Sequence, residues 1–80
     1  MRLDKYLKVS RIIKRRTVAN EACDAARVMV NGRVARASYD VKVGDILTLN
    51  FGQKTLKIQV TAVLEHVGKE QADTMYKVIE

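Results

Sequence analysis

Apolar residues at the start of the chain recur at the spacing of a helix. Leu3, Tyr6 and Leu7 fall at i, i+3 and i+4, which places them on one stripe of a short helix from Leu3 to about Val9. Asp4 lies in the first turn of that helix, where a negative charge interacts favourably with the helix dipole. The pattern therefore predicts a short amphipathic helix.

A second helix is predicted from Arg15 or Thr17 to Ala26. Its inward stripe consists only of small residues, which indicates close packing against a neighbouring element: Ala19, Ala22, Cys23 and Ala26. Between the two helices, Ile12 and Ile13 are predicted to anchor a tight connection in the hydrophobic core.

From Arg27 onward the apolar residues follow a period of two, which is typical of strands with one buried face. The predicted inward residues are Val28, Val30, Val34 and Tyr39. Asn31 and Gly32 both tolerate the positive φ of a type I′ turn, so they predict a β-hairpin. A second turn at residues 43–45 precedes a strand predicted over residues 46–51.

The last part of the chain is predicted to complete a sheet. Gly52-Gln53 reverses the chain into a strand from Thr55 to about His66. The inward residues of that strand are Leu56, Ile58 and Val60. Residues 68–74 predict a polar loop and residues 76–79 a short final strand. The order of elements predicts an α+β fold in one domain of 80 residues, with two N-terminal helices packed on a small, mostly antiparallel sheet.

Positive charge is concentrated at the start of the chain. The 80 residues include 15 Lys and Arg against nine Asp and Glu, for a net charge of +6. Seven of these cations and one carboxylate, Asp4, lie in the first sixteen residues. This concentration favours binding to a polyanion over a solvated basic face with no partner. If these residues are helical, Arg11 and Arg15 are i, i+4 neighbours, and so are Arg16 and Asn20. A helix that starts near Arg15 would add free backbone N–H groups that can bind an anion.

The residue types indicate which polyanion is bound. Aromatic residues make up only 5% of the chain, so recognition of single strands by base stacking is not expected. The sequence also lacks a long recognition helix for reading the major groove of DNA. Contacts with phosphates and 2′-hydroxyls of structured RNA fit the basic residues best. An anionic membrane surface is the weaker alternative, because the first helix is short and the second is lined by alanine.

Enzymatic and metal-binding constellations are not found in the sequence. The only histidine, His66, falls in a predicted strand, and no carboxylate pair or glycine-rich phosphate loop is evident. Neither catalysis nor a metal or cofactor site is therefore expected. Cys23, the only cysteine, is expected to be a buried inert thiol, although Arg27 four residues later leaves its reactivity open. A lone cysteine and the lack of a long apolar run predict a cytoplasmic protein.

Residues 1 to about 50 contain five motifs in a familiar order. They are Arg2-Leu3-Asp4-Lys5-x-Leu7, Arg11 with Arg16-x-x-Ala19, Val28-x-Val30-Asn31-Gly32, Ser38, and Val43-Gly44-Asp45-Ile46. Together they resemble the S4 RNA-binding domain family, which implies two helices packed on a small sheet, with RNA contacted along the helices and their connecting loop. Two positions depart from the family pattern. Arg15 replaces the usual serine N-cap of the second helix, and Ala26 replaces its terminal glycine, which puts the left-handed cap in doubt.

Within that family, residues 2–31 are most similar to the small stand-alone proteins of bacterial ribosome-associated quality control, which are related to the small heat-shock S4 proteins. The resemblance implies a non-catalytic adaptor that binds 23S rRNA and P-site peptidyl-tRNA on stalled large (50S) ribosomal subunits. It also implies action with the factor RqcH, which adds alanine tails to the nascent chain; direct contact with RqcH stays open. We expect a cytoplasmic, ribosome-associated monomer.

The residues expected to contact RNA are the N-terminal cations and two polar neighbours: Arg2, Asp4, Lys5, Lys8, Arg11, Lys14, Arg15, Arg16 and Asn20. Arg16 is the expected central contact, since a guanidinium group binds phosphate oxygens in a bidentate manner. Asp4 is expected to hold Arg2 or Arg16 in position, or to cap the first helix; the sequence leaves these roles open. Two other functions stay open, namely a constitutive ribosomal or subunit-assembly protein and a general RNA chaperone.

Overall fold

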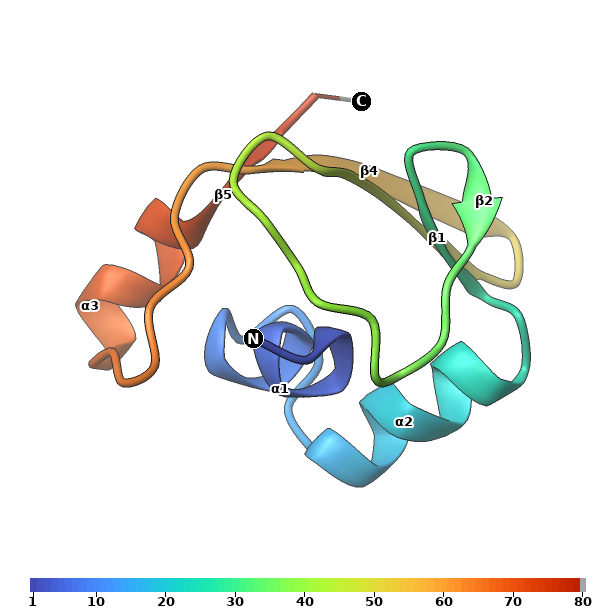
Figure 1. Cartoon of the computed structure of the whole chain (residues 1–80), viewed down its shortest axis with the longest axis horizontal. Helices are drawn as coiled ribbons and strands as arrows, with labels where there is room; N and C mark the ends of the chain where they lie inside the picture. Colours follow the sequence, from blue (N-terminus) through green and yellow to red (C-terminus); the bar gives the residue numbers. More distant parts are fainter. Residues whose placement is uncertain (80) are drawn as a thin grey trace.

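The computed structural model describes residues 1–79, which form helices packed against one five-stranded sheet (Figure 1). In chain order the elements are α1 (Leu3–Val9), α2 (Arg16–Asp24), β1 (Val28–Val30), β2 (Arg33–Val34), β3 (Ile46–Phe51), β4 (Lys54–Val60), α3 (Lys69–Ala72), a 3₁₀ turn (Asp73–Met75) and β5 (Tyr76–Val78). In Figure 1, α1 and α2 lie beneath the sheet, and α3 lies at the opposite end of the molecule from α2. The predicted α+β fold is confirmed.

The strands pair in the order β2-β1-β3-β4-β5, and every neighbouring pair is antiparallel. The register aligns inward side chains across the sheet, because Val30 lies opposite Leu47, which in turn lies opposite Ile58. These buried residues belong to one cluster with the apolar stripe of α1, which consists of Leu3, Tyr6 and Leu7. The core therefore lies between one face of the sheet and the helices, as is common for small antiparallel sheets.

The first turn of α1 is held by the chain that follows β2, not by a side-chain cap. The N–H groups at the start of a helix have no partner within the helix. Here the N–H of Leu3 donates to the Tyr39 carbonyl at 2.8 Å. The N–H of Asp4 donates to the Ala37 carbonyl at 3.2 Å. These bonds fix the N-terminal end of α1 to the sheet layer.

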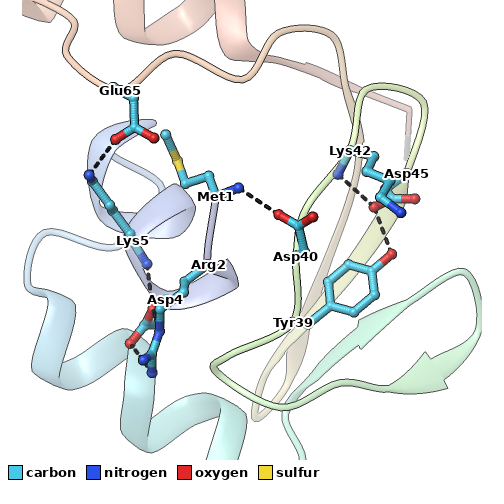
Figure 2. A network of polar contacts seen from close by, with 9 residues as sticks. All are labelled: Met1, Arg2, Asp4, Lys5, Tyr39, Asp40, Lys42, Asp45 and Glu65. Carbon is cyan, nitrogen blue, oxygen red and sulfur yellow. Dashed lines mark hydrogen bonds and ion pairs between the residues drawn. The ribbon is translucent and has the colours of Figure 1, made fainter.

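Asp45 closes the connection between β2 and β3. Its carboxylate accepts hydrogen bonds from the Asn31 side-chain amide at 3.1 Å, the Tyr39 hydroxyl at 2.9 Å and the Lys42 backbone N–H at 3.0 Å. Figure 2 shows the last two of these contacts. Burial alone would raise the pKa of Asp45, but the three hydrogen bonds hold it below its ordinary value. Asn31 and Gly32 have φ of 52° and 84°, which confirms the predicted hairpin turn.

A residue with left-handed backbone follows each of the first two helices just beyond the C-cap, namely Arg11 after α1 (φ 64°) and Ala26 after α2 (φ 60°). The N–H of Ala26 donates to the Cys23 carbonyl. The N–H of Arg27 donates to the Ala22 carbonyl, which completes a Schellman motif. The left-handed cap is therefore present although alanine replaces the usual glycine. The prediction that Ala26 lies on the inward stripe is wrong, because it follows the helix and is exposed.

Three expectations for the sheet layer are also wrong. Val34, in the two-residue strand β2, is 59% exposed and does not face the core. Strand β4 ends at Val60, earlier than predicted, because its pairing with both neighbouring strands ends there. Residues 68–74 contain α3 and the start of the 3₁₀ turn, not a polar loop. The helical conformation places Ala72 and Met75, three residues apart, together in the interior.

Candidate nucleic-acid interface

Five of the predicted RNA-contacting residues line one open groove with a volume of about 770 Å³. The first wall is formed by α1, the α1–α2 connection and the first residue of α2, with the cations Lys5, Lys8, Arg11, Lys14 and Arg16. The second wall is formed by the end of the segment between β4 and α3 and by the first residue of α3, where Glu65, His66 and Lys69 line the groove. The groove therefore gathers six Lys and Arg side chains with one carboxylate, an excess of charge suited to a polyanion.

Arg11 reaches the groove through a turn and not along a helix. Its left-handed backbone costs about 1–2 kcal/mol for a residue with a side chain. Its N–H donates to the Lys8 carbonyl at 3.0 Å, which closes the turn after α1. The expectation that Arg11 and Arg15 lie one turn apart on a helix is wrong, because α2 begins only at Arg16. Strained backbone of this kind is concentrated at functional sites.

Asp4 joins α1 to α2, and its side chain is only 3% exposed. Its carboxylate pairs with Arg2 (Nε to Oδ1, 3.2 Å) and Arg16 (Nε to Oδ2, 3.4 Å), and accepts a hydrogen bond from Asn20 (3.2 Å). The backbone N–H of Lys5 donates to the same carboxylate at 2.8 Å. Of the roles that the sequence left open, Asp4 therefore holds both arginines; it is not the N-cap of α1, since it lies inside the helix and binds only the N–H of the next residue, Lys5. Figure 2 shows its contacts with Arg2 and Lys5.

The partners of Asp4 keep its carboxylate charged. Burial would raise the pKa of this carboxyl, but the hydrogen bonds from Asn20, Arg16 and the Lys5 backbone outweigh burial and hold the pKa below its ordinary value. The side chains of Arg2 and Arg16 remain 52% and 47% exposed. Each arginine is therefore fixed at one side by a buried carboxylate and keeps exposed donors that a phosphate could accept.

The remaining predicted residues lie outside the groove. Arg2 and Asn20 border a neighbouring hollow of about 460 Å³, together with Arg36 from the chain after β2. Arg15 precedes α2 as its N-cap, is exposed and lines neither hollow. Within residues 1–79, no side chain caps the start of α2, in keeping with the replacement of serine by Arg15. Asp4 thus connects Arg16 at the groove with Arg2 at the neighbouring hollow, where Arg2 and Arg36 lie with the carboxylate of Asp24.

Sequence reasoning missed the second wall of the groove. Glu65, His66 and Lys69 lie in a part of the chain with no excess of positive charge, and no local motif marks them. Glu65 forms an ion pair with Lys5, which is 60 residues away in the sequence (Figure 2). This hydrogen-bonded pair lowers the pKa of Glu65. Only the tertiary contact between the two walls identifies these residues as part of the site.

Cys23 does not contribute reactive chemistry. Its side chain faces the core, and burial raises the pKa of its thiol to about 11, with the charges of Asp4 and Asp24 adding to the effect. The thiol is therefore protonated at neutral pH, and the nearby Arg27 does not activate it. Among residues 1–79, no cluster of three or more His, Cys, Asp or Glu side chains is placed to hold a metal ion. No helix in the same range is long and apolar enough to cross a membrane.

The helices and cations that form the groove belong to a part of the chain that is similar to known proteins. The S4 domain model matches residues 1–47, a range that contains all nine predicted RNA-contacting residues. The chain belongs to the S4 domain family. An RQC P-site tRNA stabilizing factor of Halalkalibacterium halodurans is 56% identical, over 98% of this chain and 89% of its own length. The protein of the same name from Bacillus subtilis is 52% identical, over 100% of this chain and 93% of its own length.

A solved structure shares the fold. Heat Shock Protein 15 of Vibrio cholerae superimposes with a TM-score of 0.90 and 29% identity, over 98% of this chain and 80% of that protein. These relatives confirm the predicted resemblance to the quality-control branch of the S4 family, the RqcP group, and to its heat-shock members. The Vibrio cholerae structure is trimeric, which does not fit the predicted monomer.

Proposed function

We propose that this protein is a cytoplasmic RNA-binding adaptor of ribosome-associated quality control. It binds 23S rRNA and P-site peptidyl-tRNA on stalled large (50S) ribosomal subunits, and it supports RqcH-dependent alanine tailing of the nascent chain without catalysing a reaction. The observation that carries the proposal is the groove in which six cations from two distant parts of the chain gather. More than half of the sequence is also identical to relatives that are named for stabilizing a P-site tRNA.

The groove suits recognition of RNA by shape. Five cations lie on the first wall and Lys69 lies on the second, so the phosphates of an inserted RNA are contacted from both walls. Each neutralised phosphate releases counterions, which makes binding tight at low salt and weak at high salt. The proposed contacts are Arg2, Lys5, Lys8, Arg11, Lys14, Arg15, Arg16 and Asn20. Arg16 is the central one, because Asp4 orients its guanidinium group at the edge of the groove.

Asp4 is a positioning residue in this proposal. Its side chain is almost fully buried, and a carboxylate in direct contact would repel phosphate. It acts through Arg2 and Arg16, whose guanidinium groups it holds on two adjacent surfaces. Two exposed arginines on separate surfaces support simultaneous contact with two RNA segments. Binding at an rRNA–tRNA junction would then raise tRNA occupancy by linkage between the two contacts.

Co-sedimentation with purified large subunits tests the proposal. Subunits with and without bound peptidyl-tRNA are compared at two salt concentrations, with wild-type protein, Arg16→Ala and the control Lys54→Ala. Wild-type protein should prefer the tRNA-bearing subunits, and salt should weaken its binding. Arg16→Ala should lose about 1.5–3 kcal/mol of binding free energy, the range for a charge-assisted hydrogen bond. Lys54→Ala should match wild type, because Lys54 is exposed at the β3–β4 hairpin and outside the groove.

The same experiment separates the alternatives. Equal binding to both kinds of subunit would contradict the quality-control role and favour a constitutive ribosomal or assembly protein. Equal binding to unrelated RNAs would favour a general RNA chaperone. Addition of RqcH to the tRNA-bearing subunits then tests the remaining step, since alanine tailing should fall when wild-type protein is replaced by Arg16→Ala.

A further inference from the structure

The second wall of the groove lies outside the S4 match, yet the fold holds it firmly against α1. The S4 model ends at residue 47, whereas the wall is formed by residues 65–69. The chain on the far side of this wall is anchored by the buried Tyr6 of α1, whose hydroxyl donates to the Met75 carbonyl at 2.7 Å. The Thr61 hydroxyl donates to the Thr74 carbonyl at 2.7 Å, which ties the two ends of the segment together.

The charges on this wall are arranged unevenly. Lys69 is exposed at the start of α3 and lines the groove, so it adds a cation opposite those of α1. Among residues 1–79, Glu65 is the only carboxylate that lines the groove, and its side chain is 63% exposed. It pairs with Lys5 across the gap between the walls. Two of the six groove cations are therefore already paired with carboxylates of the chain: Arg16 with the buried Asp4, and Lys5 with the exposed Glu65.

We propose that residues 65–69 form a second RNA-contacting wall, in which Lys69 binds a phosphate and Glu65 competes with phosphate for Lys5. The inference rests on the proposed RNA-binding function and extends the site beyond the S4 motif. A phosphate pairs with Lys5 only after it displaces the Glu65 carboxylate, which repels it. RNA that reaches both walls offsets this cost with the contact to Lys69. RNA that touches only the first wall gains no contact with Lys69 and does not offset the cost. Glu65 therefore selects for RNA that fills the groove.

Two probes test this selectivity. The first is the large subunit with bound peptidyl-tRNA, and the second is a short RNA duplex of unrelated sequence. Glu65→Gln should raise affinity for the duplex about two- to fivefold, the range for an exposed ion pair, and raise affinity for the subunit less. The matched control is Glu70→Gln, since Glu70 is exposed on α3 but does not line the groove. The gain from Glu65→Gln should shrink in a Lys5→Ala background, because the competition acts through Lys5.

Lys69 is tested by the salt dependence of binding. Lys69→Ala should weaken subunit binding about two- to fivefold and reduce the slope of log affinity against log salt by about one, as expected for a lost phosphate contact. Lys54→Ala is the control, and Lys69→Arg should retain binding because it keeps the charge. Circular dichroism melting curves establish that each variant is folded.

The outcomes distinguish this inference from the function on which it rests. If Arg16→Ala weakens binding but the Glu65 and Lys69 variants match their controls, the second wall does not contact RNA and the inference is overturned alone. A gain from Glu65→Gln that is unchanged in the Lys5→Ala background would overturn the competition for Lys5. Wild-type protein that fails to bind the subunits would overturn the proposed function itself.

Discussion

The helical layer, residues 1–26, and the sheet layer, residues 27–79, differ in which residues adopt left-handed backbone. In the helical layer these residues are Arg11 and Ala26. In the sheet layer, three of the four residues with left-handed backbone are glycines. The fourth is Asn31, which tolerates this conformation better than other residues. A residue with a side chain adopts left-handed backbone at a cost of about 1–2 kcal/mol, whereas glycine does so freely. The helical layer therefore carries strain at its turns that the sheet layer avoids.

The residues at the helix starts differ as well, because Gly68 precedes α3 in the sheet layer, whereas arginines precede α1 and α2. Arg2 and Arg15 occupy the N-cap positions of α1 and α2, and neither helix has a side-chain cap within residues 1–79. Cations at these positions interact unfavourably with the helix dipole. In the sheet layer, by comparison, the Asp45 carboxylate receives three hydrogen bonds and closes two turns. Left-handed residues with side chains and N-cap arginines are therefore concentrated in the layer that gathers cations, where the buried Asp4 carboxylate supplies a compensating network, as Asp45 does in the sheet layer.

The largest expected effect is a loss of stability in the sheet layer when the Asp45 carboxylate is removed. Asp45→Ala should lower the free energy of unfolding by about 2–3 kcal/mol, because it leaves donors of Asn31, Tyr39 and Lys42 without their charged acceptor. Chemical denaturation measures this loss, with Asp73→Ala as an exposed control. RNA affinity of the folded variant should stay within a factor of two. A loss of affinity without a loss of stability would show that the two layers are not divided in this way.

A smaller effect is expected in the helical layer, at the left-handed residue Ala26. Ala26→Gly should raise the free energy of unfolding by about 1 kcal/mol, because glycine removes the cost of the left-handed cap after α2. The neighbouring Ala25→Gly is the control. Ala25 has φ of −84°, so glycine there relieves no strain and should not stabilise the protein. Melting temperatures of the two variants provide the measurement, and equal shifts for both would contradict the presence of strain at Ala26.

The smallest expected effect is on the loss of folding stability at acidic pH. The pKa of Asp4 is lower in the folded protein than its ordinary value, so the unfolded chain binds more protons in the acid range. The stabilisation is therefore complete above the ordinary pKa of aspartate and is lost as the pH falls through the folded pKa. The pKa of Asp45 is also lowered in the folded protein, so its protonation in acid reduces the free energy of unfolding as well. Asp4→Asn should give a shallower fall of unfolding free energy between neutral and acidic pH, and denaturation curves with the same slope as wild type would contradict this role.

Much of the fold follows from local patterns. The predicted helix over residues 3–9 and the predicted strand over residues 46–51 have the observed bounds, since each depends on apolar periodicity within one element. The Asn31-Gly32 turn depends on the conformational freedom of two adjacent residues. The cluster of N-terminal cations is also visible in the sequence, because charge that is close in the chain stays close in a short helical hairpin.

Other features required the tertiary structure. Periodicity predicted that the strand through Val60 continues, but a strand ends where its partners end, and pairing is not encoded in a single segment. The pattern of small residues predicts a buried Ala26, because such a pattern does not show where a helix ends. Polar residues 68–74 form α3 and the start of the 3₁₀ turn because Ala72 and Met75 are drawn into a core formed by distant segments.

The sequence by itself therefore determined the order of elements, the main apolar stripes and the basic character of the N-terminal helices, because these depend on residues close together in the chain. Only the tertiary structure decided which cations share a groove, how Asp4 connects Arg2 with Arg16, and that Glu65 faces Lys5. The physical reason is that these interactions depend on distances between segments, which the folding of helices onto the sheet sets and which no local pattern contains.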